Sequence, residues 1–249
     1  MQPEIDLLGV PLKTFGICFA LAFIAAGLLL ARRFREFRWP AEHATEAMLA
    51  ALAGGLIGAR AYWLLDAYDP DTHGNLIDSL IDGAGLTWYG GAAGGALAVL
   101  AWATWRGHLE ERLLGATAPV LALGYAIGRV GCQISGDGDY GKSSDLPWAM
   151  SYPDAAVPTT SDVQPTPIYE TLAMGFAAML LWQMRDRMRP AALFALYLML
   201  AGSERLLIEF WRQNDEVVAS LTTAQLTSVA MVLAGGIALL SLRNRMRRS

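Results

Sequence analysis

The stretch FGICFALAFIAAGLLLA, residues 15–31, carries no charged side chain and runs directly into Arg32 and Arg33. A helix needs about 20 predominantly apolar residues to cross the hydrocarbon core of a bilayer. We therefore expect this stretch, with the residues beside it, to form a membrane-spanning helix. Its basic residues follow the apolar run, whereas those of a cleaved signal peptide precede it, so we expect the helix to remain in the protein.

The composition supports a membrane protein over the whole chain. Hydrophobic residues make up 54% of the 249 residues and charged residues only 17%, compared with about 25% charged residues in soluble domains. Apolar runs recur from end to end, which excludes a disordered, coiled-coil or collagen-like chain. The net charge of −4 argues against nucleic acid as the principal partner. The two cysteines, Cys18 and Cys132, cannot build a disulfide framework.

Seven apolar segments are long enough, or nearly so, to span a membrane. The sixth is short unless it continues through residues 206–210, which would draw Arg205 and Glu209 into the membrane region. We predict an all-α protein with seven transmembrane helices in one domain, residues 1–249, whose outer segments 66–87 and 132–166 form caps or loops. The predicted spans are Phe15–Ala31, Ala44–Leu65, Trp88–Trp105, Leu114–Val130, Pro167–Met184, Ala191–Ser203 and Thr223–Leu242.

Basic residues predict the orientation of this seven-span arrangement. Most of the 19 Lys and Arg residues follow the odd-numbered spans, and the positive-inside rule makes that side cytoplasmic. We therefore expect the amino terminus outside and the carboxyl terminus in the cytoplasm. Aspartates gather in the opposite loops, between residues 66 and 82 and between residues 137 and 162. The basic residues on the predicted cytoplasmic side are Arg32, Arg33, Arg35, Arg38, Arg106, Arg112, Arg185, Arg187, Arg189, Arg243, Arg245, Arg247 and Arg248.

Four arginines do not follow this rule, because they lie inside or at the outer ends of apolar spans: Arg60, Arg129, Arg205 and Arg212. Charged side chains in such positions usually face a cavity or a partner, although a single one could instead extend its charge to the membrane surface. Together they favour an anion site at the outer face, with Glu170, Glu204 and Glu209 as nearby acids. Arg205 and Glu209 are four residues apart and would share one helix face.

Several ordered motifs add a more specific indication. They are Gly55–Arg60, Gly85–Gly91, Gly128–Gly141, the Pro165, Tyr169 and Glu170 set, and the Arg205 and Glu209 pair. Glycines at three- and four-residue spacing in the second to fourth spans also favour close helix packing. In this order, the motifs resemble those of the bacterial phosphatidylglycerol–prolipoprotein diacylglyceryl transferase family, and the resemblance covers nearly the whole chain.

This resemblance implies a reaction that moves diacylglycerol from phosphatidylglycerol to a cysteine thiol of a prolipoprotein and releases glycerol phosphate. It implies phosphatidylglycerol, prolipoprotein signal peptides and the bilayer as partners, and the bacterial cytoplasmic (inner) membrane as location, with the active site toward the outer face. No cofactor, metal or nucleic acid is expected, since the chain has no phosphate loop with Lys and too few histidines for a zinc cluster.

Carried onto this sequence, the resemblance gives two groups of site residues. The expected catalytic residues are Arg129, Arg205, Asp137, Glu209 and Tyr89. The expected substrate-binding residues are Arg60, Arg212, Gly90, Gly91, Gly141, Tyr169 and Glu170. Arginine suits a phosphate leaving group, because its planar fork pairs with phosphate through two hydrogen bonds and stays charged.

The chain departs from the family pattern at several positions. Phe15 and Tyr89 stand where the family usually has Tyr and His, Cys132 and Ser135 replace asparagines, and Asp137 replaces a Glu. Without that His, the acceptor of the thiol proton is open between Asp137, Glu209, Tyr89 and His73. Two alternatives also stay open: a divergent paralogue that uses another lipid or acceptor, and a non-catalytic protein that binds or transports lipid.

Overall fold

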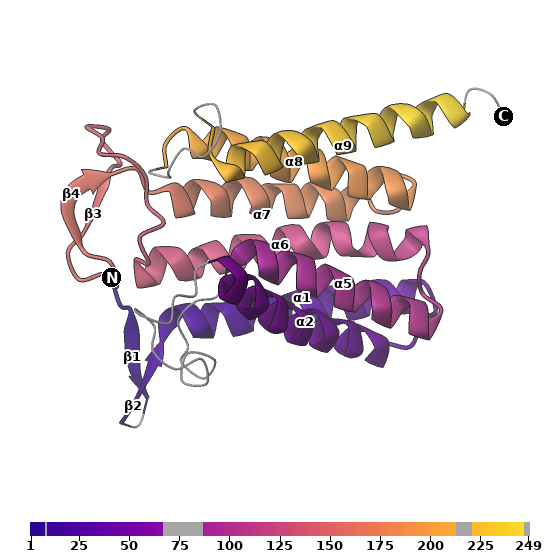
Figure 1. Cartoon of the computed structure of the whole chain (residues 1–249), viewed down its shortest axis with the longest axis horizontal. Helices are drawn as coiled ribbons and strands as arrows, with labels where there is room; N and C mark the ends of the chain where they lie inside the picture. Colours follow the sequence, from indigo (N-terminus) through magenta and orange to yellow (C-terminus); the bar gives the residue numbers. More distant parts are fainter. Residues whose placement is uncertain (8, 67–86, 213–220, 247–249) are drawn as a thin grey trace. The chain divides into compact units, whose positions relative to one another are not determined.

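The computed structural model describes residues 1–7, 9–66, 87–212 and 221–246. Within these ranges the chain forms seven helices: α1 (Thr14–Glu36), α2 (Glu42–Asp66), α5 (Trp88–Arg106), α6 (Glu111–Ser135), α7 (Thr166–Met184), α8 (Pro190–Glu209) and α9 (Thr223–Met246). Two antiparallel hairpins accompany them, one of β1 (Glu4–Leu7) and β2 (Val10–Lys13), the other of β3 (Met150–Tyr152) and β4 (Thr159–Val163). Figure 1 draws these helices as long coiled ribbons and labels them along the chain.

Each predicted span lies inside one of these helices, so the helical part of the prediction is confirmed. The sixth helix continues to Glu209 and therefore includes Arg205, as the length of a span requires. Among the described residues, α1, α2, α6, α8 and α9 are long and apolar enough to cross a membrane. The other two, α5 and α7, have 19 residues each, and their glycine, tryptophan or polar residues lower their mean hydropathy.

The hairpins were not predicted. Each strand has three to five residues, too few for an alternating pattern to stand out from the sequence around it. The predicted outer segment 132–166 begins with the last turn of α6 and contains the second hairpin. Nearly all of the other predicted outer segment, 66–87, lies outside the described residues.

The chain forms two compact units: residues 1–30 with 111–249, and residues 31–110. In the first unit, α6, α7 and α8 pack around small and medium-sized apolar side chains. Ala118, Ala122 and Ala126 line one side of α6 and meet Met174 and Leu181 of α7 together with a residue of α8. Alanine at four-residue spacing allows the helix axes to approach closely. The α8 residue is Leu193.

Helix α9 packs on α8 through glycine in the same unit. A Cβ atom at Gly202 would lie 2.8 Å from the carbonyl oxygen of Ser228, and one at Gly235 would lie 2.6 Å from that of Ala195. Both distances are shorter than real Cβ contacts, so only glycine fits there. Figure 1 shows that α6 and α8 end, and α7 and α9 begin, at the end of this unit that carries β3 and β4.

In the second unit, α2 and α5 make a still closer contact. A Cβ atom at Gly58 would overlap the carbonyl oxygen of Gly90 and lie 2.8 Å from the Cα atom of Gly94. Gly54 meets Gly94 in the same way. The expectation that glycines mark a close helix approach is confirmed here, and the two backbones touch without intervening side chains.

Polar side chains join the other end of this helix pair. Arg106 at the end of α5 donates to both carboxylate oxygens of Glu46 in α2, at 2.6 and 2.8 Å, and the indole nitrogen of Trp102 donates to the same carboxylate at 3.0 Å. Nearby, His43 Nδ1 and His108 Nε2 are 2.8 Å apart. The second unit is therefore held by backbone contact along its length and by a polar cluster at one end.

The glycine contact predicts opposite effects for two substitutions three residues apart in α2. Gly58→Ala places a methyl group on the backbone of α5 and should lower stability by about 1–3 kcal/mol, equivalent to roughly 2–4 °C in Tm per kcal/mol. Gly55→Ala should leave the Tm unchanged or raise it, because its Cβ would lie 3.5 Å from the nearest atom, an ordinary contact. Thermal unfolding of the detergent-solubilised variants tests this. Equal melting temperatures for both variants would contradict it.

Candidate active site

The candidate site is built around Glu170, in the first turns of α7. Its side chain is fully buried. Its Oε2 atom lies 3.2 Å from Nε of Arg129 in α6, and its Oε1 atom lies 3.2 Å from Nη1 of Arg205 in α8. The hydroxyl of Tyr125 donates to Oε1 at 2.8 Å. One carboxylate thus connects three helices, and each guanidinium is held by a buried negative charge.

The Arg205 side chain has a second acidic partner on its own helix. Its Nη2 atom lies 2.9 Å from Oε2 of Glu209, as the four-residue spacing predicted. Glu209 is only 4% exposed, and Thr222, just before α9, donates to its Oε1 atom at 2.6 Å. Because both of its carboxylate partners are buried, Arg205 is fixed in one orientation.

A loop after α6 supplies the third carboxylate, that of Asp139. It pairs with Nη1 of Arg129 and, at 2.6 Å, with Nη2 of Arg212. Arg212 Nη1 also donates to the backbone oxygen of Asp139 at 3.0 Å. Arg212 follows the end of α8 and so does not lie on the helix of Arg205. The Asp139 carboxylate therefore links α6 to the segment that follows α8.

Glycines make this loop path possible. Gly136 and Gly138 have φ values of +62° and +92°, which favour glycine. Gly141 forms a β-bridge with Arg212, and a Cβ atom there would overlap the carbonyl oxygen of Trp211. The Thr166 hydroxyl donates to the Asp139 backbone oxygen at 2.6 Å. Gly141 thus lets the loop pass against the end of α8, where Asp139 meets both arginines.

The acidity of Asp139 reflects these partners. Burial disfavours its charged form, but the positive charges of Arg129 and Arg212 and their hydrogen bonds outweigh this effect and lower its pKa to about 2 from an ordinary value of 3.8. The carboxylate is therefore ionised under all physiological conditions. The loop is tied to the helices by ion pairs rather than by neutral hydrogen bonds.

Other predicted residues of the first unit lie around this cluster. Asp137 accepts a hydrogen bond from the backbone nitrogen of Asp139 at 3.3 Å, and its carboxylate, that of Asp139 and the Cys132 sulfur lie within 4.8 Å of one another. Tyr169 receives a hydrogen bond from Trp148 at 2.7 Å and donates to Gln164 at 2.8 Å. Tyr169 thus anchors the outer segment to the start of α7.

Four predicted residues belong to the second unit. Gly90 and Gly91 pack against α2, where Gly90 approaches the Gly58 backbone. Tyr89 contacts the ring of Trp88 edge-on, and the Arg60 guanidinium lies over the ring of Trp63, 4.9 Å from its centre. For both glycines, packing explains the absence of a side chain. His73, one of the possible proton acceptors, lies outside the described residues.

Three members of the cluster were missed as site residues: Tyr125, Asp139 and Thr222. The spacing of Tyr125 and Arg129 could have indicated a contact, since residues four apart share a helix face. The guanidinium does lie over the Tyr125 ring, 4.9 Å from its centre. Asp139 depends on the path of the loop and Thr222 on the approach of α9, and neither leaves a local pattern in the sequence.

Glu204 was one of three acids named near the arginines as possible partners for some of them, but among the described residues it makes no ion pair. Helix geometry explains this difference. Successive residues of a helix are rotated by about 100°, so Glu204 points to a different side of α8 from Arg205. Its Oε1 atom is shielded from solvent and has no hydrogen-bond partner within the described ranges.

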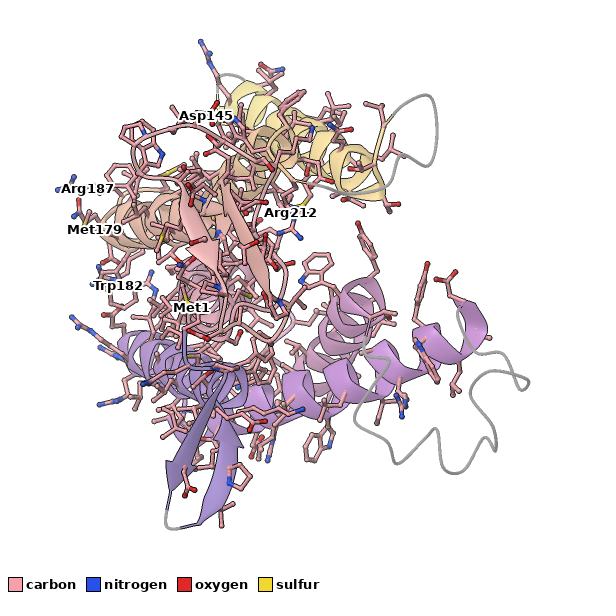
Figure 2. The ribbon with its side chains drawn as sticks, turned by 90° about the vertical axis from the view of Figure 1, so that its left-hand side faces the viewer. Met1, Asp145, Met179, Trp182, Arg187 and Arg212 are labelled. Carbon is pink, nitrogen blue, oxygen red and sulfur yellow. The ribbon has the colours of Figure 1, made fainter. Side chains whose placement is uncertain are left out.

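The geometry defines a class of protein: a helical membrane protein with three arginines held by carboxylates at one end of a bundle. In Figure 2, which looks onto this end, Arg212 lies beside the strands of the second hairpin, whereas Trp182 and Arg187, which lie at or beyond the far end of α7, are drawn at the edge of the view. Oriented guanidinium groups in apolar surroundings are suited to binding a phosphate and to stabilising charge that develops on it.

Comparison with known proteins identifies the family. The chain belongs to the prolipoprotein diacylglyceryl transferase family, whose model matches residues 4–241. A phosphatidylglycerol–prolipoprotein diacylglyceryl transferase from Leptospira interrogans is 30% identical over 231 residues, covering 82% of this chain and 73% of the relative. Relatives of the same name from Clostridium tetani and Methylobacillus flagellatus are 27% and 30% identical, each covering 94% of this chain and 95% of the relative.

The low pKa of Asp139 predicts a pH-dependent contribution to stability. A carboxyl group whose pKa is lowered by folding stabilises the protein above the pKa of the unfolded state, and this contribution is lost as the pH falls toward the folded value. With pKa values of 3.8 and about 2, the contribution is about 2 kcal/mol and disappears between about pH 4 and pH 2.

Unfolding in detergent from pH 6 to pH 2 measures this contribution. Asp139→Asn should be less stable than the wild type at pH 6, and the difference should shrink toward pH 2. Asp154→Asn, which changes an exposed residue of the same outer segment, should follow the wild type at every pH. A gap between the Asp139→Asn variant and the wild type that stays constant would show that the ion pairs do not cause it.

Proposed function

We propose that this protein transfers the diacylglyceryl group of phosphatidylglycerol to the lipobox cysteine of prolipoproteins, at the outer face of the bacterial cytoplasmic membrane. The family match supports the reaction, and one structural observation supports its location in the fold: Arg129 and Arg205 lie on either side of the buried carboxylate of Glu170. Two guanidinium groups held at one point form a binding site for the phosphate diester of a lipid.

The reaction makes a clear demand on these arginines. The cysteine sulfur, as a thiolate, attacks the glycerol carbon that carries the phosphate, and a carbon–sulfur bond forms. The carbon–oxygen bond breaks, its electron pair stays on the phosphate oxygen, and glycerol phosphate leaves. Negative charge grows on the phosphate during this step, so cationic donors fixed beside it lower the barrier.

The carboxylates orient the arginines without using all of their donors. Within the described residues, Nη2 of Arg129 and Nε of Arg205 have no carboxylate partner, while the other nitrogens of these two groups face Asp139, Glu170 and Glu209. In our proposal, these remaining N–H groups bind the phosphate. The acids prevent the guanidinium groups from reorienting when the lipid arrives, which preorganises the site.

The other predicted residues take supporting roles in this proposal. Asp137, on the loop beside Cys132, is a candidate acceptor of the thiol proton, and Arg212, held by Asp139 of the same loop, binds the lipid headgroup. Arg60, Tyr89, Gly90 and Gly91, which belong to the second unit, remain proposed substrate-binding residues, and Tyr169 and Gly141 shape the outer segment of the first unit. Both substrates are membrane-embedded, so we propose lateral entry from the bilayer into a single transmembrane domain.

We also propose seven membrane spans, with the amino terminus outside. At 1.5 Å per residue, a 19-residue helix is about 28 Å long, close to the thickness of the hydrocarbon core. Helices α5 and α7 are therefore long enough to cross despite their lower hydropathy. The family match favours the transferase reaction over a divergent paralogue and over a non-catalytic lipid-binding protein.

The reaction is tested by supplying the purified protein with phosphatidylglycerol vesicles and a lipobox peptide, and detecting thioether-lipidated peptide by mass. Arg129→Ala and Arg205→Ala should each slow the transfer by roughly 100-fold or more, the usual cost of losing one donor to developing charge. Arg129→Lys should fall between them and the wild type, because it keeps the charge but loses the planar fork.

Arg187→Ala is the matched control, since Arg187 is an exposed residue of the same unit, in the connection between α7 and α8 (Figure 2). Its rate should equal that of the wild type, and melting temperatures should show that every variant is folded. Absence of lipidated peptide with the wild type, across lipid compositions and peptide sequences, would rule out the proposed reaction.

The proposed topology predicts a labelling pattern for two exposed positions. Ser161→Cys, in β4, should react with a membrane-impermeant maleimide added to intact spheroplasts. Arg187→Cys, between α7 and α8, should react only after the membrane is permeabilised. The native Cys18 and Cys132 are both buried and give a low background. The reverse pattern would invert the predicted orientation.

A further inference from the structure

The residue directly before α9 contacts both the start of that helix and the arginine cluster. The Thr222 hydroxyl accepts a hydrogen bond from the backbone nitrogen of Gln225 at 3.2 Å, and the Gln225 side chain accepts one from the backbone nitrogen of Thr222 at 3.0 Å. Such a reciprocal pair is a capping box, which satisfies two backbone donors at the start of a helix. The same hydroxyl donates to Oε1 of Glu209 at 2.6 Å. Thr222 therefore joins the first turn of α9 to a carboxylate of the candidate site.

The packing of α9 on α8 explains why these residues meet. The two helices run in opposite directions (Figure 1), and they touch where a Cβ atom at Gly202 would lie 2.8 Å from the carbonyl oxygen of Ser228. From this contact, about two turns forward along α8 lead to Glu209, and about two turns back along α9 lead to Thr222. The glycine contact thus sets the register that brings the end of α8 to the start of α9.

Thr222 and Arg205 hold the two oxygens of the Glu209 carboxylate. Its Oε2 atom lies 2.9 Å from Nη2 of Arg205, and its Oε1 atom receives the Thr222 hydroxyl. Glu209 is the last residue of α8, and helix ends fray. Both Glu209 and Thr222 are buried, so water does not readily replace a lost donor. Without the hydroxyl, the carboxylate would be held at one oxygen by a group that itself needs support.

The guanidinium group of Arg205 depends on two carboxylates. Its Nη1 atom lies 3.2 Å from Oε1 of Glu170 in α7, and its Nη2 atom is held by Glu209. Contacts on two nitrogens fix the plane of a guanidinium group, whereas a single contact leaves it free to rotate. In the proposed function, the Nε atom of Arg205 binds the phosphate, so this plane decides whether the donor faces the substrate.

We propose that Thr222 is a positioning residue of the transfer reaction. Its hydroxyl fixes the carboxylate of Glu209, and Glu209 holds Arg205 in the plane in which Nε binds the phosphate. Thr222 acts through these two residues and does not contact the substrate. This role rests on the proposed function, which assigns Arg205 to the phosphate. It makes the start of α9, which supplies none of the paired charges described above, a support of the reacting site.

The test compares Thr222→Val, Thr222→Ser and the wild type in the thioether assay, at a temperature well below every Tm. Valine has the shape of threonine without its hydroxyl, so kcat should fall by roughly tenfold, the usual cost of a lost hydrogen bond to a charged group. The KM for phosphatidylglycerol should change by less than about twofold, because oriented donors act mainly on charge that grows in the transition state. Serine keeps the hydroxyl and should restore most of the wild-type kcat.

A double variant shows whether Thr222 acts through Arg205. In the Arg205→Ala background the guanidinium group is absent, so Thr222→Val should cause no further loss of kcat. Residues that act through one another show such non-additive effects, whereas independent defects add in free energy. A loss of the same size with and without Arg205 would overturn the proposed role.

Two controls separate the bond to Glu209 from the stability of α9. Gln225→Ala removes the other half of the capping box, so it should lower the Tm, as Thr222→Val does, and keep the wild-type kcat. Thr227→Val makes the same substitution farther along α9, where the hydroxyl bonds to backbone oxygens of its own helix at 3.0 Å. Its kcat should equal that of the wild type.

The remaining outcomes are distinct. An active wild type with an unchanged kcat in Thr222→Val would overturn the proposed role and leave the proposed function intact. A loss of kcat in Gln225→Ala as large as that in Thr222→Val, at the same fall in Tm, would trace the effect to helix stability and also overturn it. Equal losses in the Val and Ser variants would show that the hydroxyl is not responsible. A wild type that forms no thioether would remove the proposed function, and this role with it.

Discussion

The buried carboxylate of Glu170 is the constraint on which the first unit depends. A carboxylate without solvent is stable only if cations and hydrogen-bond donors surround it, and here two guanidinium groups and a tyrosine hydroxyl provide them. The same condition holds for the arginines, which would be equally unfavourable without their acids. Because these groups come from α6, α7 and α8, the need to pair them determines how the ends of the three helices meet.

This arrangement separates two tasks that an anion site in a membrane must perform. The paired acids balance the charge of the guanidinium groups inside the bundle and fix their orientation. In the proposed function, Nη2 of Arg129 and Nε of Arg205, which have no carboxylate partner among the described residues, are left to bind the phosphate. Small residues make this arrangement possible. Gly141 leaves room for the loop that brings Asp139 to the arginines, and the alanines of α6 let α7 approach closely.

The sequence was sufficient to predict the helices, because a long apolar run in a membrane protein can satisfy its backbone hydrogen bonds in few other conformations. Their ends extend past the apolar runs by several polar residues, such as Glu111 at the start of α6 and Glu209 at the end of α8. The Arg205 and Glu209 pair was predictable because both lie on one helix. The contacts of Asp139 were not, since they depend on a loop path and on three elements distant in sequence. The hairpins also escaped prediction, as very short strands have no distinctive period.

The shared use of Asp139 by Arg129 and Arg212 restricts how this protein can diverge. Replacement of Asp139 leaves Arg212 without its carboxylate partner among the described residues and removes one of the two carboxylate partners of Arg129, whereas matched replacement of Asp139 and Arg212 leaves no such charge. Natural variation at positions 129, 139 and 212 should therefore be correlated, and changes that look harmful alone should be tolerated in combination. The ion pairs thus link the evolution of the loop that carries Asp139 to that of α6 and of the segment after α8.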